Sequence, residues 1–148
     1  MIRHAIADDL YPLCALAKRF INETNLPYTY DDELTRNNFW NGIHDNGSII
    51  LVDIQEELLA GLVMGYMERD FCKEYSAYIT KLYVEKEFRG SSIARDLITA
   101  FEAETTEATL LFTSATGGMG ERNEKLYVHL FEHAGYAVLG RILVKENL

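Results

Sequence analysis

A nearly unbroken apolar run, LLAGLVMGYMER at residues 58–69, restricts the fold more than any other feature of the chain. A strand with one face in water alternates apolar and polar residues, whereas a continuous apolar run is typical of a strand covered on both faces. Strand-like segments stand on either side of it, SIILVDI at 48–54 and SAYITKLYV at 76–84. The second is rich in β-branched and aromatic residues. We therefore expect a sheet whose central strand is buried on both faces.

Helical spacing of apolar residues alternates with these strands. The pattern predicts about four helices, near residues 9–22, 34–43, 92–104 and 123–134. Further strands are predicted at 2–6 and 109–115, with a last strand or pair of strands in YAVLGRILVKE. The chain has 148 residues, which is one domain's worth. We predict a single α+β domain spanning 1–148.

The charge balance limits the kinds of partner that the chain can bind over a broad surface. With 14 basic and 23 acidic residues the net charge is −9, which disfavours nucleic acid and anionic membrane and mildly favours a cationic or amine-bearing partner. Two cysteines, Cys14 and Cys72, are too few for a disulfide framework. The N-terminus does not resemble a signal peptide, and no apolar run approaches the roughly 20 residues of a membrane span. We expect a cytoplasmic protein.

The stretch FRGSSIARDL, which follows the strand at 76–84, has the features of an anion site. The first amides of a helix are unpaired donors at the positive end of the helix dipole, and both properties favour a phosphate. Arg89 and Arg95 can add cationic contacts, and Gly90 lets the backbone turn close to an anion. Ser91 or Ser92 would cap the helix and offer a hydroxyl. An ordinary joint between a strand and a helix would look similar.

The sequence HLFEH at 129–133 matches the H-x-x-E-H pattern of one class of zinc peptidases. On a helix, two histidines one turn apart can share a metal. The alternative is that His129 and His133 flank a buried stripe on the surface. We expect no metal.

The longer segment KLYVEKEFRGSSIARDLI resembles the acetyl-coenzyme A (acetyl-CoA) binding motif of the GNAT family of N-acetyltransferases, which reads Q/R-x-x-G-x-G/A. Arg89 takes the first position, Ser92 the fourth, where the family has glycine, and Ala94 the last. The order of elements is similar to the family's over essentially the whole chain. The resemblance implies a GNAT-like fold with a mixed, mostly antiparallel sheet of six to seven strands that splays between strands four and five.

The resemblance also implies how acetyl-CoA, the cosubstrate, would be held. In the family the pantetheine arm pairs with strand four, here Leu82, Tyr83 and Val84, where a backbone N–H would polarise the thioester carbonyl. The diphosphate would sit on the amides of the turn and the helix start: Arg89, Gly90, Ser91, Ser92, Ile93, Ala94 and Arg95. Asn123 and Phe131 are further candidate coenzyme contacts. Asn123 lies one residue from the family's usual asparagine, and Phe131 stands where the family has a tyrosine.

Two residues are candidates for proton transfer. The family's tyrosine protonates the leaving thiolate, and Phe131 has no proton to give. Tyr127 lies one turn earlier and could replace it, with packing as the alternative role. If 58–69 pairs with 76–84, Glu68 falls opposite Tyr78 and Tyr66 opposite Thr80, on the face that bears Leu82. Glu68 is the candidate base for the attacking amine, unless it is only a solvated residue at a strand end.

For the acceptor, the resemblance points to the loop LPYTYDDEL at 26–34. Tyr28 and Tyr30 with the acidic run would suit an amine-bearing small molecule or protein, although a solvated loop explains them equally. Tyr66, Tyr78 and Thr80 are further candidate substrate contacts. The predicted function is transfer of acetyl from acetyl-CoA to a primary amine by direct attack. The alternative is an inactive GNAT-fold module that binds or senses coenzyme A. Dimerisation through the last strands is common in the family, and a homodimer is expected.

Overall fold

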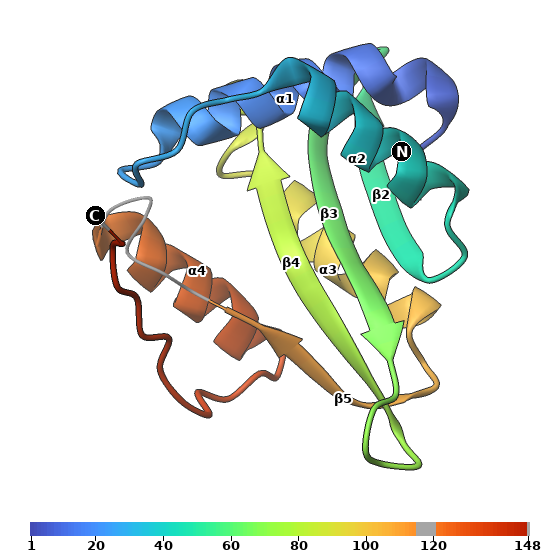
Figure 1. Cartoon of the computed structure of the whole chain (residues 1–148), viewed down its shortest axis with the longest axis vertical. Coiled ribbons are helices and arrows are strands. Elements are labelled where there is room, and N and C mark those ends of the chain that lie inside the picture. The colour runs from blue at the N-terminus through green and yellow to red at the C-terminus, as the bar shows by residue number, and fades with distance from the viewer. Residues whose placement is uncertain (115–120, 148) are drawn as a thin grey trace.

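The computed structural model describes residues 1–114 and 121–147 (Figure 1). Five strands form one sheet in the order β1-β2-β3-β4-β5. The strands are β1 (Ile2–His4), β2 (Ser48–Gln55), β3 (Leu58–Glu68), β4 (Tyr75–Val84) and β5 (Ala108–Thr113). Neighbouring strands are antiparallel except β4 and β5, which are parallel. The prediction of a mixed, mostly antiparallel sheet is confirmed.

The helices are α1 (Leu10–Glu23), α2 (Asp32–His44), α3 (Ile93–Glu104) and α4 (Glu121–His133), with short 3-10 turns η1 (Ala7–Asp9) and η2 (Lys86–Phe88). The expected four helices are therefore present. α2 begins two residues before the predicted start, because Asp31 caps it by accepting from Leu34 N at 2.8 Å. Within the described part of the chain, no helix combines the length and apolarity that crossing a membrane requires.

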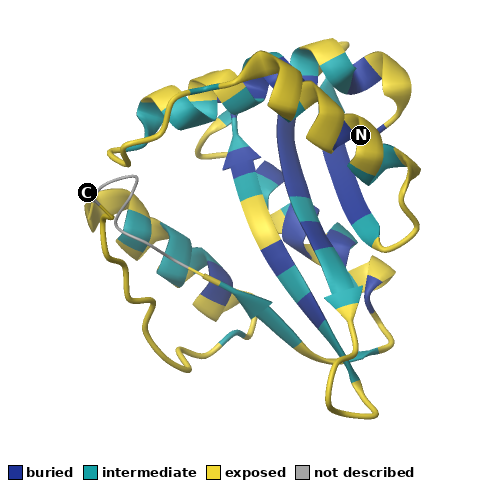
Figure 2. Ribbon diagram, viewed as in Figure 1, coloured by how far each residue is buried: buried dark blue, intermediate teal, exposed yellow. Residues whose placement is uncertain are grey.

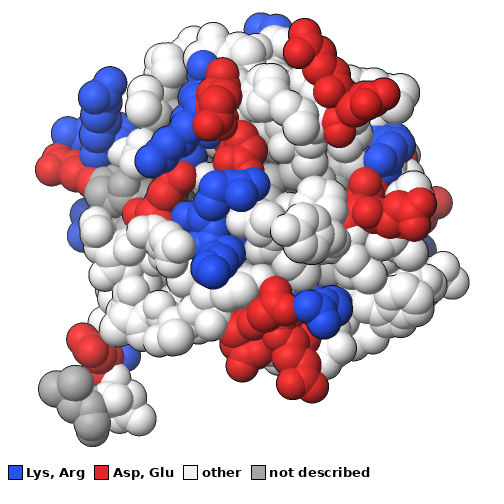
Figure 3. Space-filling model, turned by 90° about the horizontal axis from the view of Figure 1, so that it is seen from above, with Lys and Arg blue, Asp and Glu red and all other residues white. Residues whose placement is uncertain are grey.

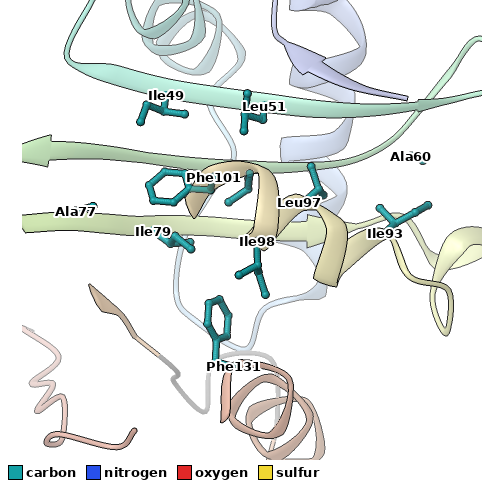
Figure 4. Close-up of a cluster of buried hydrophobic side chains, with 11 residues drawn as sticks. Ile49, Leu51, Ala60, Ala77, Ile79, Ile93, Leu97, Ile98, Phe101 and Phe131 are labelled. Carbon is teal, nitrogen blue, oxygen red and sulfur yellow. The ribbon is translucent and has the colours of Figure 1, made fainter. Parts of the chain in front are cut away.

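Two hydrophobic cores cover the two faces of the sheet. α1 and α2 pack on one face, where Leu13, Leu16 and Val52 are almost fully buried. α3 packs on the other face through Leu97 and Phe101. In Figure 4, Ile98 of α3 and Phe131 of α4 point toward one another, so α4 extends this second core beyond β4.

The central position of β3 explains its apolar sequence. β2 and β3 are the most continuously buried strands, and exposure increases toward β5, α4 and the C-terminal segment (Figure 2). Gly65 of β3 allows α3 to approach closely. A Cβ at Gly65 would lie 2.0 Å from the carbonyl oxygen of Tyr78 and 2.6 Å from the ring of Phe101. The predicted central strand, buried on both faces, is confirmed.

The turn at 69–74 and a β-bulge at Thr80 together give β3 and β4 a pairing that differs from the predicted one. Glu68 lies opposite Ser76 and Tyr66 opposite Tyr78, two residues away from the predicted register. Beyond the bulge Met64 pairs with Lys81, so one extra residue is inserted in β4. An inserted residue reverses the alternation of side chains, because successive residues of a strand point to opposite faces.

The reversed alternation has a consequence for the residues after the bulge. Leu82 and Val84 pack on the α3 face, whereas Tyr83 packs on the face covered by α1. The expectation that Leu82 shares a face with Tyr66 and Tyr78 was therefore wrong.

The C-terminal segment also differs from the prediction. Residues 136–147 contain no strand, so the sheet has five strands in the described chain instead of six or seven. The segment is strand-like in composition, but its apolar side chains are largely exposed, Leu143 at 91% and Val144 at 88%. A strand needs a partner for its backbone donors and acceptors, and this segment has none in the described part of the chain.

Candidate active site

The pairing of β4 with β5 ends halfway along β4. β5 pairs with Tyr75 to Ile79 only, and Ile79–Thr113 is the last pair. β4 continues to Val84 along β3, so in the described chain its other edge carries no strand from Thr80 onward. Figure 1 shows the two strands diverging beyond this point. This half-edge is the first component of the site.

The direction of the backbone groups on this half-edge follows from a hydrogen bond to β3. Glu85 N donates to Ala60 O on β3 at 2.8 Å. Because backbone groups of alternate residues point to opposite edges of a strand, the N–H and C=O groups of Leu82 and Val84 point away from β3. The Val84 carbonyl accordingly accepts a hydrogen bond from Arg89 Nε at 2.9 Å. The Leu82 N–H and C=O are thus placed to pair with an extended ligand.

The half-edge leads directly to the N-terminus of α3. Gly90 has a positive φ of 82°, which residues with a side chain rarely adopt, and it turns the chain into the helix. The expected serine cap takes an unusual form. Ser91 Oγ donates to Phe88 O at 2.6 Å and accepts from Ile93 N at 3.4 Å. Ser92 occupies the N-cap position, but its hydroxyl donates to Asp96 Oδ2 at 2.6 Å.

These bonds leave the first amides of α3 available. Ile93 N has only the long contact with Ser91, and the first intrahelical bond runs from Asp96 N to Ser92 O at 2.9 Å. Unpaired amides at the start of a helix are suited to an anion. This turn therefore fits the diphosphate of a coenzyme in its backbone geometry.

The two arginines of the turn have different surroundings. Arg89 forms an ion pair with Glu23 at the end of α1, with 2.8 Å between Nη2 and Oε2. The Arg95 side chain is 70% exposed and has one long contact, 3.8 Å from its Nε to Asp96. Viewed from above in Figure 3, basic and acidic side chains are interspersed over this end of the molecule. Arg89 and Arg95 therefore supply a local positive charge on a protein whose net charge is −9.

Tyr83 belongs to the α1 side of the site. Its ring is buried, and its hydroxyl donates to Glu23 Oε1 at 2.7 Å. Burial and the bond to this carboxylate raise the pKa of Tyr83. Burial alone would raise the pKa of Glu23, but the bonds from Tyr83 and Arg89 bring it below its ordinary value. The side chain of Tyr83 therefore points to α1, and its backbone N–H and C=O point toward β3, so neither is directed at the open edge of β4.

Tyr127 of α4 lies at the point where β4 and β5 part. Its hydroxyl is 2.6 Å from Thr113 Oγ1. Thr113 Oγ1 in turn donates to Ile79 O at 3.3 Å. Since a threonine hydroxyl has one proton and a carbonyl only accepts, Tyr127 donates to Thr113. Burial raises the pKa of Tyr127, so it remains protonated at neutral pH.

The other two predicted residues of α4 are placed differently. Phe131 is buried in the α3 core, with its ring centroid 4.6 Å from that of Tyr127. It supports Tyr127 through packing. Asn123 lies in the first turn of α4, which begins at Glu121 and so two residues before the predicted start at 123.

The candidate base and two candidate substrate residues share the face that bears α1 and α2. Tyr66 stacks on Tyr78 with a centroid distance of 5.1 Å, and Tyr78 stacks on Phe112 of β5 at 5.2 Å. We call these three rings the aromatic row. Glu68 is exposed and lies two residues beyond Tyr66, hence on the same face. The structure thus brings a carboxylate and an aromatic surface together at one end of the sheet.

A cavity adjoins the aromatic row between α2 and the sheet. Its volume is about 460 Å³, and Tyr66 and Thr80 line it together with Asn38, Asn41 and Asp45. Thr80 Oγ1 donates to Met64 O at 3.3 Å. The cavity therefore connects the bulged residue of β4 with polar side chains of α2.

The two tyrosines of the loop between α1 and α2 have unlike roles. Tyr28 is exposed, at the surface of the loop. The Tyr30 hydroxyl lies 3.1 Å from Cys14 O and 3.0 Å from Asp32 Oδ1. Burial and the bond to Asp32 raise the pKa of Tyr30 to about 12. Tyr30 therefore ties the loop to α1, and Tyr28 is the one that a ligand can reach.

The histidines of HLFEH lie near each other on α4. Their rings are 4.1 Å apart, and His133 Nδ1 is 3.0 Å from His129 O. Among the residues that the structure describes, no group of three or more His, Cys, Asp or Glu side chains could hold a metal.

The structure adds residues that the sequence did not reveal as members of the site. Glu23, Thr113 and Phe112 belong to elements far apart in the sequence, and Asn38 and Asn41 carry no motif. Phe112 is half-buried like its neighbours Leu111 and Thr113 in β5, so nothing in the strand distinguishes it as a site residue. These residues can be recognised as members of the site only when the pairing of the strands is known.

Comparisons with known proteins agree with this geometry. Residues 12–137 match the model of the acetyltransferase (GNAT) family. No curated protein matches the chain. A mutant of the BH1408 protein from Bacillus halodurans is similar in structure, with a TM-score of 0.81 at 15% identity, covering 100% of this chain and 99% of that one.

Two further solved structures were determined with a coenzyme. A predicted acetyltransferase from Clostridium acetobutylicum with acetyl-CoA has a TM-score of 0.78 at 20% identity and covers 99% of this chain and 95% of that one. The aminoglycoside N-acetyltransferase AAC(6')-Iy in complex with CoA has a TM-score of 0.79 at 12% identity, covering 99% and 93%. At these identities the likeness shows the fold, while the family match covers most of the chain. This chain belongs to the GNAT acetyltransferase family.

Proposed function

We propose that the protein transfers the acetyl group of acetyl-CoA to a primary amine. The observation that carries the proposal is the half-edge of β4 from Thr80 to Val84, which has no strand partner in the described chain and leads to the open N-terminus of α3. An extended pantetheine arm pairs with such an edge as a strand would. A diphosphate then meets the amides that begin at Gly90.

The reaction proposed for this site is direct attack. The amine nitrogen forms a bond to the thioester carbonyl carbon, and the carbonyl electron pair moves to oxygen. The Leu82 N–H, which points to this edge, stabilises the resulting oxyanion. Collapse of the intermediate re-forms the carbonyl and breaks the C–S bond, which releases the coenzyme thiolate.

Two protons are transferred in this scheme. The nitrogen must lose a proton, because a lysine-like amine is charged until it is deprotonated. Glu68 lies five residues along β3 from Val63, the partner of Leu82, so it receives this proton through a chain of waters. The thiolate takes a proton from Tyr127, whose hydroxyl lies where β4 and β5 part. A buried tyrosine that remains protonated can act as this acid once its hydroxyl turns from Thr113 to the sulfur.

The acceptor is proposed to be an amine-bearing small molecule or protein. The aromatic row offers an apolar surface to the carbon skeleton of an amine, and Glu68 offers a carboxylate beside it. The polar cavity formed with Asn38 and Asn41 suits an acceptor that also carries hydroxyl or amide groups. The aminoglycoside acceptor of a structurally similar enzyme has this chemistry, and it supports the proposal by analogy.

The experiment that tests the proposal has two measurements. Acetyl-CoA should raise the melting temperature of the protein in a thermal-shift assay, and free thiol should appear when amines are added. The amine panel should include aminoglycosides, polyamines and peptides with a free N-terminus. Absence of both stabilisation and thiol release would reject the coenzyme assignment.

The same assay addresses the alternative of an inactive module. That alternative is favoured by Phe131, which stands where the family has its proton-donating tyrosine. Stabilisation by acetyl-CoA without thiol release for any amine would support a binding or sensing module and contradict the transferase.

A further inference from the structure

Among the described residues the Arg89 side chain makes three contacts, and none of them is with the start of α3. Its Nε donates to Val84 O at 2.9 Å, and its Nη2 donates to Glu23 Oε2 at 2.8 Å. Its guanidinium lies 5.3 Å from the centroid of the Tyr83 ring, in a cation–π contact. These contacts fix the guanidinium in position and orientation.

Glu23 is itself fixed by this arrangement. One carboxylate oxygen accepts from Arg89 and the other from the Tyr83 hydroxyl at 2.7 Å. The Glu23 side chain is 18% exposed, so both of its oxygens are engaged in a half-buried position. Glu23, Tyr83 and Arg89 thus form one connected unit, which we call the Glu23 clamp.

A second ion pair lies one turn earlier on α1. Arg19 bonds to Glu85, which is buried in the segment between β4 and η2. Arg19 and Glu23 are four residues apart on α1, and Glu85 and Arg89 are four residues apart in the chain that leads to α3. Two ion pairs of opposite polarity therefore fasten the end of α1 to the turn at Gly90.

The two arginines of this turn differ in how closely a carboxylate neutralises their charge. A carboxylate in contact with Arg89 cancels much of its charge and repels an incoming phosphate. Arg95 has one long contact with a carboxylate and is exposed on the first turn of α3. Arg95 is therefore the less neutralised of the two cations, and Arg89, whose side chain is 40% exposed, is the one held by contacts within the protein.

We propose that Arg89 is a positioning residue, and that the Glu23 clamp uses it to hold the turn so that the backbone amides from Gly90 to Ile93 face the diphosphate of the coenzyme. This inference rests on the proposed function, because it assigns a role within the coenzyme site. It differs from a direct phosphate contact in predicting that a positive charge at position 89 is not sufficient without the geometry of the guanidinium. It also makes the end of α1 part of that site.

Calorimetric titration with CoA tests the inference on three single variants. Arg89→Lys keeps the charge but cannot donate to both Val84 O and Glu23 as the guanidinium does. Glu23→Ala removes the carboxylate and leaves the cation. Both should weaken CoA binding about tenfold, the value of one charge-assisted hydrogen bond. Tyr83→Phe keeps the ring under Arg89 and should weaken binding by about two- to threefold.

Two controls separate positioning from general damage. The KM for acetyl-pantetheine, which lacks the diphosphate, should be the same in Glu23→Ala as in the unmodified protein. Combining Glu23→Ala with Arg89→Lys should add little to either loss, because both break the same clamp. Arg95→Ala should weaken CoA binding and reduce its dependence on ionic strength, whereas Glu23→Ala, which removes a negative charge, should not reduce that dependence.

Each other result overturns the inference. Wild-type affinity in Arg89→Lys would show that only charge is required there. Tighter binding in Glu23→Ala would show that Glu23 merely repels the anion. Equal losses for CoA and acetyl-pantetheine would indicate general structural damage. The unmodified protein is titrated with CoA first. If it does not bind CoA, the proposed function and this inference are both wrong. If it binds CoA, the variants test this inference alone.

Discussion

The hydrogen bond between Tyr127 and Thr113 fixes the phenol at the divergence of the strands. Thr113 uses its own proton on Ile79 O, so Tyr127 donates its phenol proton to Thr113 Oγ1. Phe131 packs against the Tyr127 ring at 4.6 Å and limits its motion. A tyrosine one turn before the usual position is therefore held by a partner from another element.

We predict that Tyr127→Phe lowers kcat by about a hundredfold, because general acid catalysis contributes about 10²–10⁴-fold. The KM for acetyl-CoA should change less than twofold, since the ring and its packing remain. Steady-state kinetics on an amine identified by the panel would measure both. Tyr11→Phe, at an exposed position on α1, is the matched control and should have no effect. An unchanged kcat in Tyr127→Phe would mean that the thiolate leaves without this acid.

At the scale of elements, the approach of α3 to β3 sets the geometry of the coenzyme site. α3 carries the first-turn amides, and the other end of its packed stripe is Phe101, which lies against Gly65. A helix that moved away from β3 would take its N-terminus away from the half-edge of β4. Because Gly65 has no side chain, α3 can lie close to β3, and this helps to place the coenzyme site.

Gly65→Ala should destabilise the fold by about 1–3 kcal/mol or more, because the new Cβ would overlap backbone as well as a ring. Urea unfolding followed by circular dichroism would give the change in free energy of unfolding. Gly140→Ala is the control, since a Cβ there meets nothing within 4 Å and should change stability by less than about 0.5 kcal/mol. Equal stability of the two variants would contradict the close approach of α3.

At the scale of the whole molecule, an apolar C-terminal segment remains uncovered. Val138, Leu139, Leu143 and Val144 are each more than 70% exposed. β5 is the last strand of the sheet in the described chain and has one unpaired edge. Exposed apolar side chains and an open strand edge on the same molecule both favour association.

We expect the protein to form a homodimer through this segment. Leu139→Asp combined with Leu143→Asp should convert the dimer to a monomer, because burying two carboxylates in an apolar contact is costly. Light scattering after size-exclusion chromatography would give the mass. Leu58→Asp, at another exposed apolar residue, should leave the mass unchanged. A monomeric mass for the unmodified protein would contradict this expectation.

Much of the fold could be predicted because its patterns are local. The continuous apolar run identified β3 as central, and helical spacing identified four helices to within a few residues. The last strands were predicted from composition alone, and the segment 136–147 has no strand. Composition indicates what a segment can form, but a strand requires a partner edge.

For the site, local motifs identified the turn at Gly90 and the stretch from Leu82 to Val84. The pairing of Glu68 with Tyr78 was wrong, since a bulge and a turn length are invisible in a periodic pattern. The site residues Glu23, Thr113 and Phe112 could not be predicted, because their roles depend on partners elsewhere in the chain.

The sequence by itself determined the elements, their order and the strand–turn–helix segment around Gly90, because each depends on the spacing of nearby residues. Only the tertiary structure decided where β5 leaves β4, which face Leu82 joins after the bulge at Thr80, and that Arg89 is paired with Glu23. These outcomes depend on contacts between residues up to 66 positions apart. Such contacts are selected by packing and by the pairing of buried polar groups, which no short stretch of sequence contains.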